Sequence, residues 1–426
     1  MRLFERSWVV FLLWLVAIVL ALVTTASLFF NLAYLLGAIL IVSFVWAWLN
    51  IHWVRVTRVT RARRSQVGEK IEEQFTVENT GRLPKLWLEV KDHSTLPAHR
   101  ASHVISGLGG KQRRTRVLRT MCLRRGRFRL GPITVISGDP LGLFVMQKRL
   151  PLTRNVVVYP RTIPLPWFQP LLGEITGGET VHRRTHYVTT DVSGVRDYAP
   201  GDSFNRIHWP GVARTGRLIA KEFELDPMAD VWIVLDMDRN AHIGAAYEDL
   251  PELFVPEVPW EAWRLPDIDP STEAYSIVTA ASLAQHFLRQ DRSVGLVTYP
   301  DSSHCELAQS DRGARQEDRL LEILAVTHPH GSISLDQVLL AEGARFNRNT
   351  TLIVITPSLK ANWVAAARHL AGRGVKVTAI IIDPGSFGLP LQADDLLAEL
   401  DGSHIPAYRV KQGDDIARAL ATLPRR

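Results

Sequence analysis

Cysteine is scarce in this chain of 426 residues, which contains only Cys122 and Cys305. The two lie far apart in sequence, and neither belongs to a CxxC pair or has histidines at zinc-binding spacing. The sequence therefore predicts two free thiols in a reducing compartment rather than a disulfide-stabilised fold.

A Walker A loop, GxxxxGK[ST], is also missing. That loop holds nucleotide phosphates with its backbone N–H groups and its lysine. Any nucleotide chemistry that accompanies this protein is therefore expected to come from a partner.

Charge is absent from the segment between Ser7 and Val54, where 48 residues include no Asp, Glu, Lys or Arg. A spanning helix needs about 20 apolar residues, so we predict a transmembrane hairpin over residues 1–54 with its turn at Ser27–Asn31. A secretory signal peptide is the alternative, but its apolar region is only about 7 to 15 residues long. Arginines flank both sides, which predicts cytoplasmic termini and cytoplasmic soluble domains in a multi-pass protein of the cell membrane.

Acidic residues are few in the next segment, with 19 Lys and Arg against 6 Asp and Glu from Arg55 to Arg129. Apolar residues there alternate at period two, as expected for strands with one buried face; examples are Phe75, Val77, Leu86, Leu88 and Val90. We predict a basic β-sandwich over residues 55–160, of immunoglobulin or fibronectin type. Single-strand nucleic-acid binders interleave aromatic residues with the charge, and this segment does not, so we predict attraction to anionic lipid and no nucleic acid.

The last part of the chain, residues 226–426, has a different texture. The apolar runs VWIVLD, SVGLVTY, TLIVITP and VKVTAIIID are separated by helical patterns. This alternation predicts a doubly wound, mostly parallel, Rossmann-like α/β domain. Ligands of such sheets bind at the carboxyl ends of the strands, where Thr356 and Asp383 are placed.

One strand end, VWIVLDMDRN, offers three oxygen-bearing side chains: Asp236, Asp238 and Asn240. Phosphotransferases of the haloacid dehalogenase type have a similar DxD pair, in which the first Asp attacks phosphorus and the second is the acid/base. Thr356 resembles the second motif of that family. Covalent catalysis of this kind needs Mg²⁺ to offset phosphate repulsion, and Asp383 is a further candidate ligand.

The same strand end also resembles the metal-ion-dependent adhesion site of von Willebrand factor A domains, which has the form DxSxS. Asp236, Asp238 and Asn240 occupy its three places, with Asp and Asn instead of the hydroxyl residues. That site takes a Thr and an Asp from later loops, and Pro357 stands where the Asp is expected. A degenerate site that still holds Mg²⁺ and a purely structural role for these carboxylates are both open.

Between the β-rich and α/β parts lies a connecting region, residues 161–225. Its stretch GVRDYAPGDSFNRIHWPGVARTGRLIAKEFE resembles the signature of the bacterial and archaeal family called domain of unknown function 58. The residues that match the signature are Arg196, Tyr198, Pro200, Gly201, Asp202, Arg206, Trp209, Arg214, Thr215 and Glu222. Ser203 and His208 depart from it, since both replace an Asp that is usual in the family.

The signature residues allow two interpretations. A Pro-Gly turn and alternating arginines and acids permit a paired network that braces neighbouring domains. The same residues also suit a surface that faces a partner. An acidic insertion, residues 241–270, carries seven acids and one arginine and is expected near the strand-end crevice. We interpret His182 and His186 as ordinary polar residues.

The family resemblance implies a membrane-anchored protein whose von Willebrand factor A-like domain mediates protein contacts. Members are commonly encoded beside MoxR-type AAA+ ATPases, which implies a chaperone-like partner system. We therefore expect a non-enzymatic adaptor with no certain cofactor, in which a divalent cation such as Mg²⁺ is the one candidate. The phosphotransferase is the alternative.

Overall fold

The computed structural model describes residues 7–168, 192–198, 207–223, 230–244, 268–301, 305–348, 350–390 and 393–421. The chain forms two compact units. Unit 1 comprises Met1–Ile163, Ala245–Asp269 and Asp318–His328, and unit 2 comprises Pro164–Gly244, Pro270–Glu317 and Pro329–Arg426. Both cysteines are free, as predicted.

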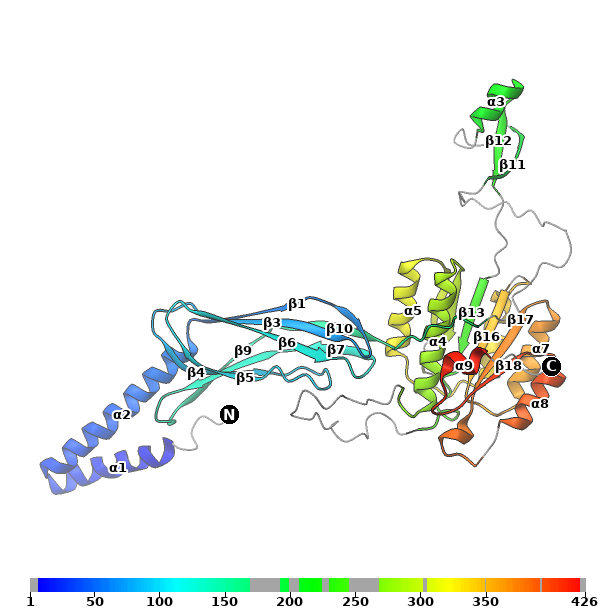
Figure 1. Cartoon of the computed structure of the whole chain (residues 1–426). Helices are drawn as coiled ribbons and strands as arrows, with labels where there is room; N and C mark the ends of the chain where they lie inside the picture. The colour runs from blue at the N-terminus through cyan, green and yellow to red at the C-terminus, as the bar shows by residue number, and fades with distance from the viewer. Residues whose placement is uncertain are drawn as a thin grey trace. The chain divides into compact units, whose positions relative to one another are not determined.

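Unit 1 begins with two apolar helices, α1 (Ser7–Thr24) and α2 (Ser27–Ile51), which lie side by side (Figure 1). Both are long and apolar enough to cross a membrane, and most of their surface is exposed. The predicted turn at Ser27–Asn31 is wrong, because the chain reverses at Thr25 and Ala26 and the later apolar residues already belong to α2. The Thr24 hydroxyl donates to Leu20 O (2.6 Å) where α1 ends.

The rest of the N-terminal part of unit 1 consists of three sheets. The first has the order β1-β3-β6, the second β5-β4-β8-β9, and the third β2-β10-β7. Their bounds are β1 (Val54–Thr60), β2 (Arg64–Gln66), β3 (Lys70–Asn79), β4 (Lys85–Asp92), β5 (His103–Leu108), β6 (Arg113–Met121), β7 (Gly126–Leu130), β8 (Ile133–Gly138), β9 (Val145–Leu150) and β10 (Arg154–Tyr159).

Side chains from the first two sheets share one hydrophobic core, which includes Phe75 and Val77 of β3 and Leu88 and Val90 of β4. The period-two pattern predicted this burial, because alternate residues of a strand face the same side. Leu86 was assigned to the same face but is 41% exposed. It lies at the start of β4, next to Lys85.

Unit 2 contains a six-stranded sheet with the order β15-β14-β13-β16-β17-β18. All neighbours pair in parallel except β15, which is antiparallel to β14. The strands are β13 (Asp230–Leu235), β14 (Val294–Thr298), β15 (Glu306–Asp311), β16 (Thr350–Thr356), β17 (Lys376–Ile382) and β18 (Ala407–Val410). The four apolar runs of the sequence are thus four neighbouring strands, and the mostly parallel sheet is confirmed.

Helices cover both faces of this sheet (Figure 1). The helix α4 contacts β13, β14 and β16, and its inward residues are buried. Trp232 and Val234 point to the other face, where they pack with residues of α6, α7 and α8. The helices of this part of the chain are α4 (Thr272–Arg289), α5 (Ala314–Val326), α6 (Leu335–Glu342), α7 (Asn362–Gly372), α8 (Asp394–Gly402) and α9 (Ile416–Ala421), with short 3₁₀ turns η3 (Gly343–Arg345) and η4 (Pro384–Phe387).

The family signature forms a small local fold, which we call the signature hairpin. It consists of the antiparallel strands β11 (Val192–Asp197) and β12 (Ile219–Phe223) and the helix α3 (Trp209–Thr215). The ring of His208 caps α3 by accepting from Gly211 N (3.1 Å), and Gly216 ends the helix in the left-handed conformation. A histidine in place of the family's aspartate therefore still serves as the helix N-cap.

Candidate functional site at the carboxyl end of the sheet

The carboxylate of Asp236, directly after β13, is bound by its own chain on both oxygens. Thr356 at the end of β16 donates its hydroxyl to Oδ2 (2.6 Å), and the Asp238 backbone N–H donates to Oδ1 (3.0 Å). His242 donates a ring N–H to the Asp236 carbonyl (2.9 Å). Parallel strands β13 and β16 end at the same edge, and this brings Asp236 and Thr356 together although 120 residues separate them.

Burial makes the charge on Asp236 costly. The residue is 2% exposed, and its partners Thr356 and Asp238 N–H carry no charge. Burial raises the pKa of Asp236, while the two hydrogen bonds act in the opposite direction without cancelling the rise. A covalent nucleophile needs a free, ionised oxygen in reach of substrate, so this arrangement favours a structural role for Asp236.

The other two predicted ligands turn toward each other. Asn240 donates its backbone N–H and its side-chain amide to the same oxygen of Asp238, both at 3.0 Å. The backbone of Asp238 also forms an isolated parallel β-bridge with Gly331, and Arg239 N donates to Gly331 O (2.9 Å). The loop that contains Gly331 therefore lies against the predicted site, which the sequence pattern did not reveal.

The structure thus places Thr356, at the end of β16, beside the loop that carries Asp236, Asp238 and Asn240. Both Asp236 oxygens are already engaged. In the described ranges, no group of three or more His, Cys, Asp or Glu side chains is arranged to hold a metal ion. The Mg²⁺ site therefore stays a prediction.

Asp383, the further candidate ligand at the end of β17, is committed to an ion pair. Arg409 of β18 donates to its Oδ2 from Nε (2.9 Å) and Nη2 (2.7 Å), and Gly385 N donates to Oδ1 (3.1 Å). Asp383 is buried. A carboxylate held in this way caps η4 and fixes β18, and the structure does not bring it to Asp236 through any contact.

The signature residues fall into three groups, and Tyr198, directly after β11, donates its backbone N–H to Leu218 O (2.9 Å). Pro200, Gly201, Asp202 and Arg206 lie outside the described residues, and so do His182, His186 and most of the acidic insertion. Trp209, Arg214 and Thr215 lie on α3, where Trp209 is 63% exposed and the other two are also exposed. Arg196 and Glu222 lie on the paired strands β11 and β12, where Arg196 is opposite Ala220 and Glu222 is opposite Gly194.

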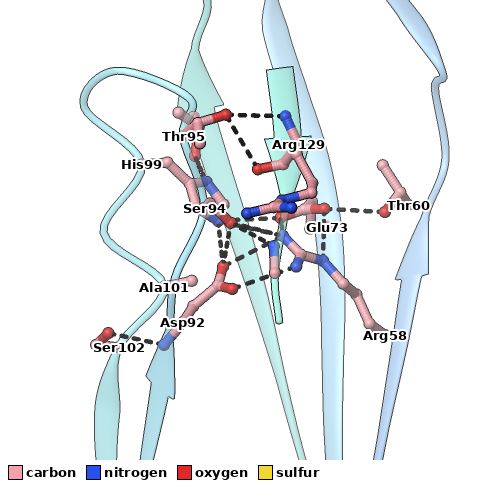
Figure 2. Close-up of polar contacts among 12 residues, drawn as sticks. Arg58, Thr60, Glu73, Asp92, Ser94, Thr95, His99, Ala101, Ser102 and Arg129 are labelled. Atoms are coloured by element: carbon pink, nitrogen blue, oxygen red, sulfur yellow. Dashed lines mark hydrogen bonds and ion pairs between the residues drawn. The ribbon is translucent and has the colours of Figure 1, made fainter. Parts of the chain in front are cut away.

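A second polar cluster, in the β part of unit 1, was not predicted from sequence (Figure 2). Arg58 of β1 donates to both oxygens of Glu73 on β3, at 3.0 and 2.7 Å, and lies 3.3 to 3.4 Å from the Asp92 carboxylate at the end of β4. The His99 ring lies 2.9 Å from Asp92. All four side chains are 1 to 2% exposed. We call these four residues the buried ionic cluster.

The cluster connects two sheets and is closely satisfied. Ser94 donates to Asp92 Oδ2 (2.7 Å), and Thr60 donates to Glu73 (2.9 Å). Burial by itself would raise the pKa of Asp92, but hydrogen bonds from His99 and Ser94 and the charge of Arg58 outweigh it and lower that pKa. One sequence signal existed: Arg58 follows Val54 and Val56 at period two, so it occupies the buried face of β1.

The comparisons with known proteins give three relatives of interest. The uncharacterised protein YeaD of Bacillus subtilis is 29% identical over 121 residues, covering 26% of this chain and 28% of that protein. The uncharacterised proteins Rv1480 of Mycobacterium tuberculosis and Mb1516 of Mycobacterium bovis are 22% identical over 237 residues, covering 53% of this chain and 66% of each protein. The matches span less than two thirds of the length of these relatives.

Two solved structures that are similar to this chain each cover about a quarter of it. A CARDB domain from Pyrococcus furiosus, crystallised with di-metal ions, has 16% identity and a TM-score of 0.19 over 25% of this chain and 91% of that one. A β-glucosidase from Listeria innocua has 12% identity and a TM-score of 0.16 over 25% of this chain and 16% of that one. Such TM-scores carry no argument about fold or ligand.

The family comparison concerns the signature hairpin and the first strand of the α/β sheet. Residues 194–255 match the family model described as protein of unknown function DUF58. The matched range contains all the signature residues identified from sequence and the strand end at Asp236. The resemblance predicted from the signature is therefore confirmed, and this chain carries the DUF58 family segment at residues 194–255.

Proposed function

We propose that the protein is a non-enzymatic adaptor, anchored in a membrane by α1 and α2, that binds a protein partner through its signature hairpin. The observation that carries this proposal is the exposure of Trp209 on α3. Tryptophan and arginine are the residue types most enriched among those that dominate binding energy at protein interfaces. Trp209 and the exposed Arg214 belong to the most specific motif of the chain.

The surroundings of Trp209 support the proposal that this surface binds a partner. Leu218 is 49% exposed, and His208 N, next to Trp209, donates to the carbonyl of Ile219, next to Leu218 (2.8 Å). Trp209 and Leu218 are therefore each a sequence neighbour of one of the two residues that this backbone hydrogen bond joins. An exposed apolar pair bordered by arginine is a typical centre for a partner interface.

The α/β unit supports binding more than chemistry. Its strand order, with one antiparallel edge strand, is compatible with a von Willebrand factor A-like domain, and the Asp236 site then corresponds to a degenerate metal-ion-dependent adhesion site. Asp236 is buried with both oxygens engaged. That state disfavours the alternative, a Mg²⁺-dependent phosphotransferase with Asp236 as nucleophile, although Thr356 lies where its second motif would be.

The partner that we propose is a MoxR-type AAA+ ATPase, and this choice rests on the family resemblance. An ATPase partner is consistent with a chain in which no Walker A loop occurs. We further propose that both termini and both units face the cytoplasm, because basic residues flank the apolar helices. Nucleic acid is not a proposed partner.

A site-specific crosslinking experiment tests the adaptor. A photo-crosslinking amino acid replaces Trp209 in the full chain, expressed in its native host and illuminated in intact membranes. We expect a crosslinked AAA+ ATPase, identified by mass spectrometry. The matched control is Trp167, which is 65% exposed and lies outside the signature, and it should give no such product. Equal crosslinking from both positions, or from neither, would contradict the proposal.

The enzyme alternative has its own test. The full chain in detergent is assayed against a generic aryl phosphate with and without Mg²⁺. We expect no turnover above the background of an Asp236→Asn variant. Mg²⁺-dependent turnover that this substitution abolishes would favour the phosphotransferase over the adaptor.

A further inference from the structure

A pocket of about 480 Å³ lies in unit 1 beside the last two turns of α2. One wall consists of Phe44, Ile51 and His52, and the other comes from Phe144, just before β9, and from Met146 and Lys148 of β9. The rings of Phe44 and Phe144 meet edge to face, with centroids 5.7 Å apart. The volume lies in the range of about 300 to 1,000 Å³ typical of ligand pockets.

The pocket is at a defined depth if α2 spans a bilayer. The helix has 25 residues, so at about 1.5 Å per residue it is longer than the hydrocarbon core of about 30 Å. Roughly 20 residues from Ser27 cross the core, which places Phe44 near its edge and Ile51 among the headgroups. The exposed Trp46 and Trp48 agree with this level, because tryptophan is enriched at membrane interfaces.

Direct contacts between α2 and the sheets hold the two walls together. Asn50 donates its side-chain amide to Gly138 O at the end of β8 (2.9 Å), and this amide is buried. Lys85 of β4 donates its ammonium to Leu49 O in the last turn of α2. A positive charge at a helix C-terminus is favourable. The pocket is therefore preformed and does not require α2 to move.

The lining is complementary to an amphipathic, negatively charged molecule. Phe44, Ile51, Phe144 and Met146 provide apolar surface, while Lys148 provides an ammonium group at the side of the headgroups. None of the residues that line this described pocket is acidic. Anionic lipid is attracted to such basic positions beside a membrane by about 1 kcal/mol per Lys or Arg.

We infer that this pocket binds one anionic glycerophospholipid from the surrounding bilayer. An acyl chain packs against the paired rings of Phe44 and Phe144 and against Met146, and the phosphate accepts from the Lys148 ammonium. This inference rests on the membrane anchoring in the proposed function and adds a specific lipid site to it. The lipid holds the β part of unit 1 at the membrane surface through its charge, in addition to the covalent connection between α2 and β1.

The test measures how much lipid stays with the full chain. The protein is reconstituted in nanodiscs of phosphatidylglycerol and phosphatidylcholine, extracted in mild detergent and analysed by native mass spectrometry. We expect about one retained phosphatidylglycerol per chain. Lys148→Glu should lower its retention about tenfold, and Met146→Trp, which fills the apolar part of the pocket, should lower it similarly. Thermal unfolding checks that each variant is folded. If Lys148→Glu does not fold, Lys148→Gln replaces it in the measurement.

The matched control is Arg149→Glu, because Arg149 is also exposed on β9 but does not line the pocket. Retention in this variant should stay within about twofold of the wild type. A loss equal to that of Lys148→Glu, or equal retention of both lipids by the wild type, would overturn the site. Carbonate extraction of native membranes separates the two proposals: a chain that is released refutes the anchoring, whereas an anchored chain that retains no lipid refutes only the pocket.

Discussion

Asp92 in unit 1 and Asp236 in unit 2 are both buried carboxylates, and their pKa values move in opposite directions. Asp92 has the positive Arg58 as a neighbour and accepts from His99 and Ser94, so its pKa is lowered. Asp236 accepts from a hydroxyl and a backbone N–H, and burial raises its pKa. Burial raises the pKa of both carboxylates, and at Asp92 the hydrogen bonds and the positive charge of Arg58 reverse the net direction.

The comparison also separates two roles for buried acids. In the buried ionic cluster, opposite charges on different strands hold sheets together, so loss of one charge leaves the others uncompensated. At the strand end of unit 2, an acid whose two hydrogen-bond donors are uncharged shapes a loop at a cost that grows when it ionises.

Replacement of the central cation should have the largest effect. Arg58→Met leaves Glu73 and Asp92 buried without a counter-charge, so we expect a loss of about 3 to 5 kcal/mol in the stability of the β part of unit 1. Hydrogen–deuterium exchange of β3 amides in the full chain measures this local stability. Arg61→Ala is the control, because Arg61 is exposed and pairs with Glu72 at the surface, and it should cost less than about 1 kcal/mol.

Neutralising one acid of the cluster should cost less. Asp92→Asn leaves Arg58 with Glu73, so we expect a loss of about 1.5 to 3 kcal/mol at pH 7, the range for hydrogen bonds to charged groups. Because the folded-state pKa of Asp92 is lowered, its stabilisation is present above the unfolded pKa and disappears as the pH falls through the folded one. The gap between variant and wild type in thermal unfolding should therefore close in strong acid. A gap independent of pH would contradict the charged pairing.

The corresponding change in unit 2 should have the opposite sign. The folded-state pKa of Asp236 is raised, so its contribution to stability is present below the unfolded pKa and is lost as the pH rises through the folded one. Asp236→Asn removes that loss, and we expect the variant to unfold at a higher temperature than the wild type at pH 8, with the difference shrinking toward pH 4. Glu399→Gln, at an exposed position on α8, should show no such trend. Destabilisation at pH 8 would show that Asp236 has a charged partner when folded.

Cation binding at the strand end should give the smallest effect. Calorimetry of the full chain with Mg²⁺, Mn²⁺ and Ca²⁺ tests whether Asp236, Asp238 and Asn240 hold an ion. Because both Asp236 oxygens already accept hydrogen bonds, we expect no saturable heat. A saturable isotherm that Asp238→Ala abolishes would revive the adhesion-type site and remove the contrast with the buried ionic cluster.

Local patterns were sufficient for much of the fold. Forty-eight consecutive uncharged residues predicted two helices, although the turn was placed too late because apolar composition does not mark where one helix ends and another begins. Period-two alternation predicted the buried faces of β3 and β4, and continuous apolar runs predicted β13, β14, β16 and β17. The DUF58 match at residues 194–255 was likewise foreseeable, because the signature is a contiguous string.

The partners of the polar groups were not foreseeable. Asp236 was recognised as a strand-end acid, but its engagement by Thr356 depends on β13 and β16 being neighbours in the sheet. The loop at Gly331 comes to Asp238 in the same way. Residues distant in sequence meet only where the strand order brings their loops together.

Neighbouring residues and their period are enough to show which segments are apolar helices, which are strands and which string marks the family. The contacts of Arg58 with Glu73 and Asp92, the contact of Asp236 with Thr356 and the pocket between α2 and β9 arise only when the chain folds. Hydrogen bonds and charge pairs act over a few ångströms, so they are set by pairing register and packing, which no local pattern contains.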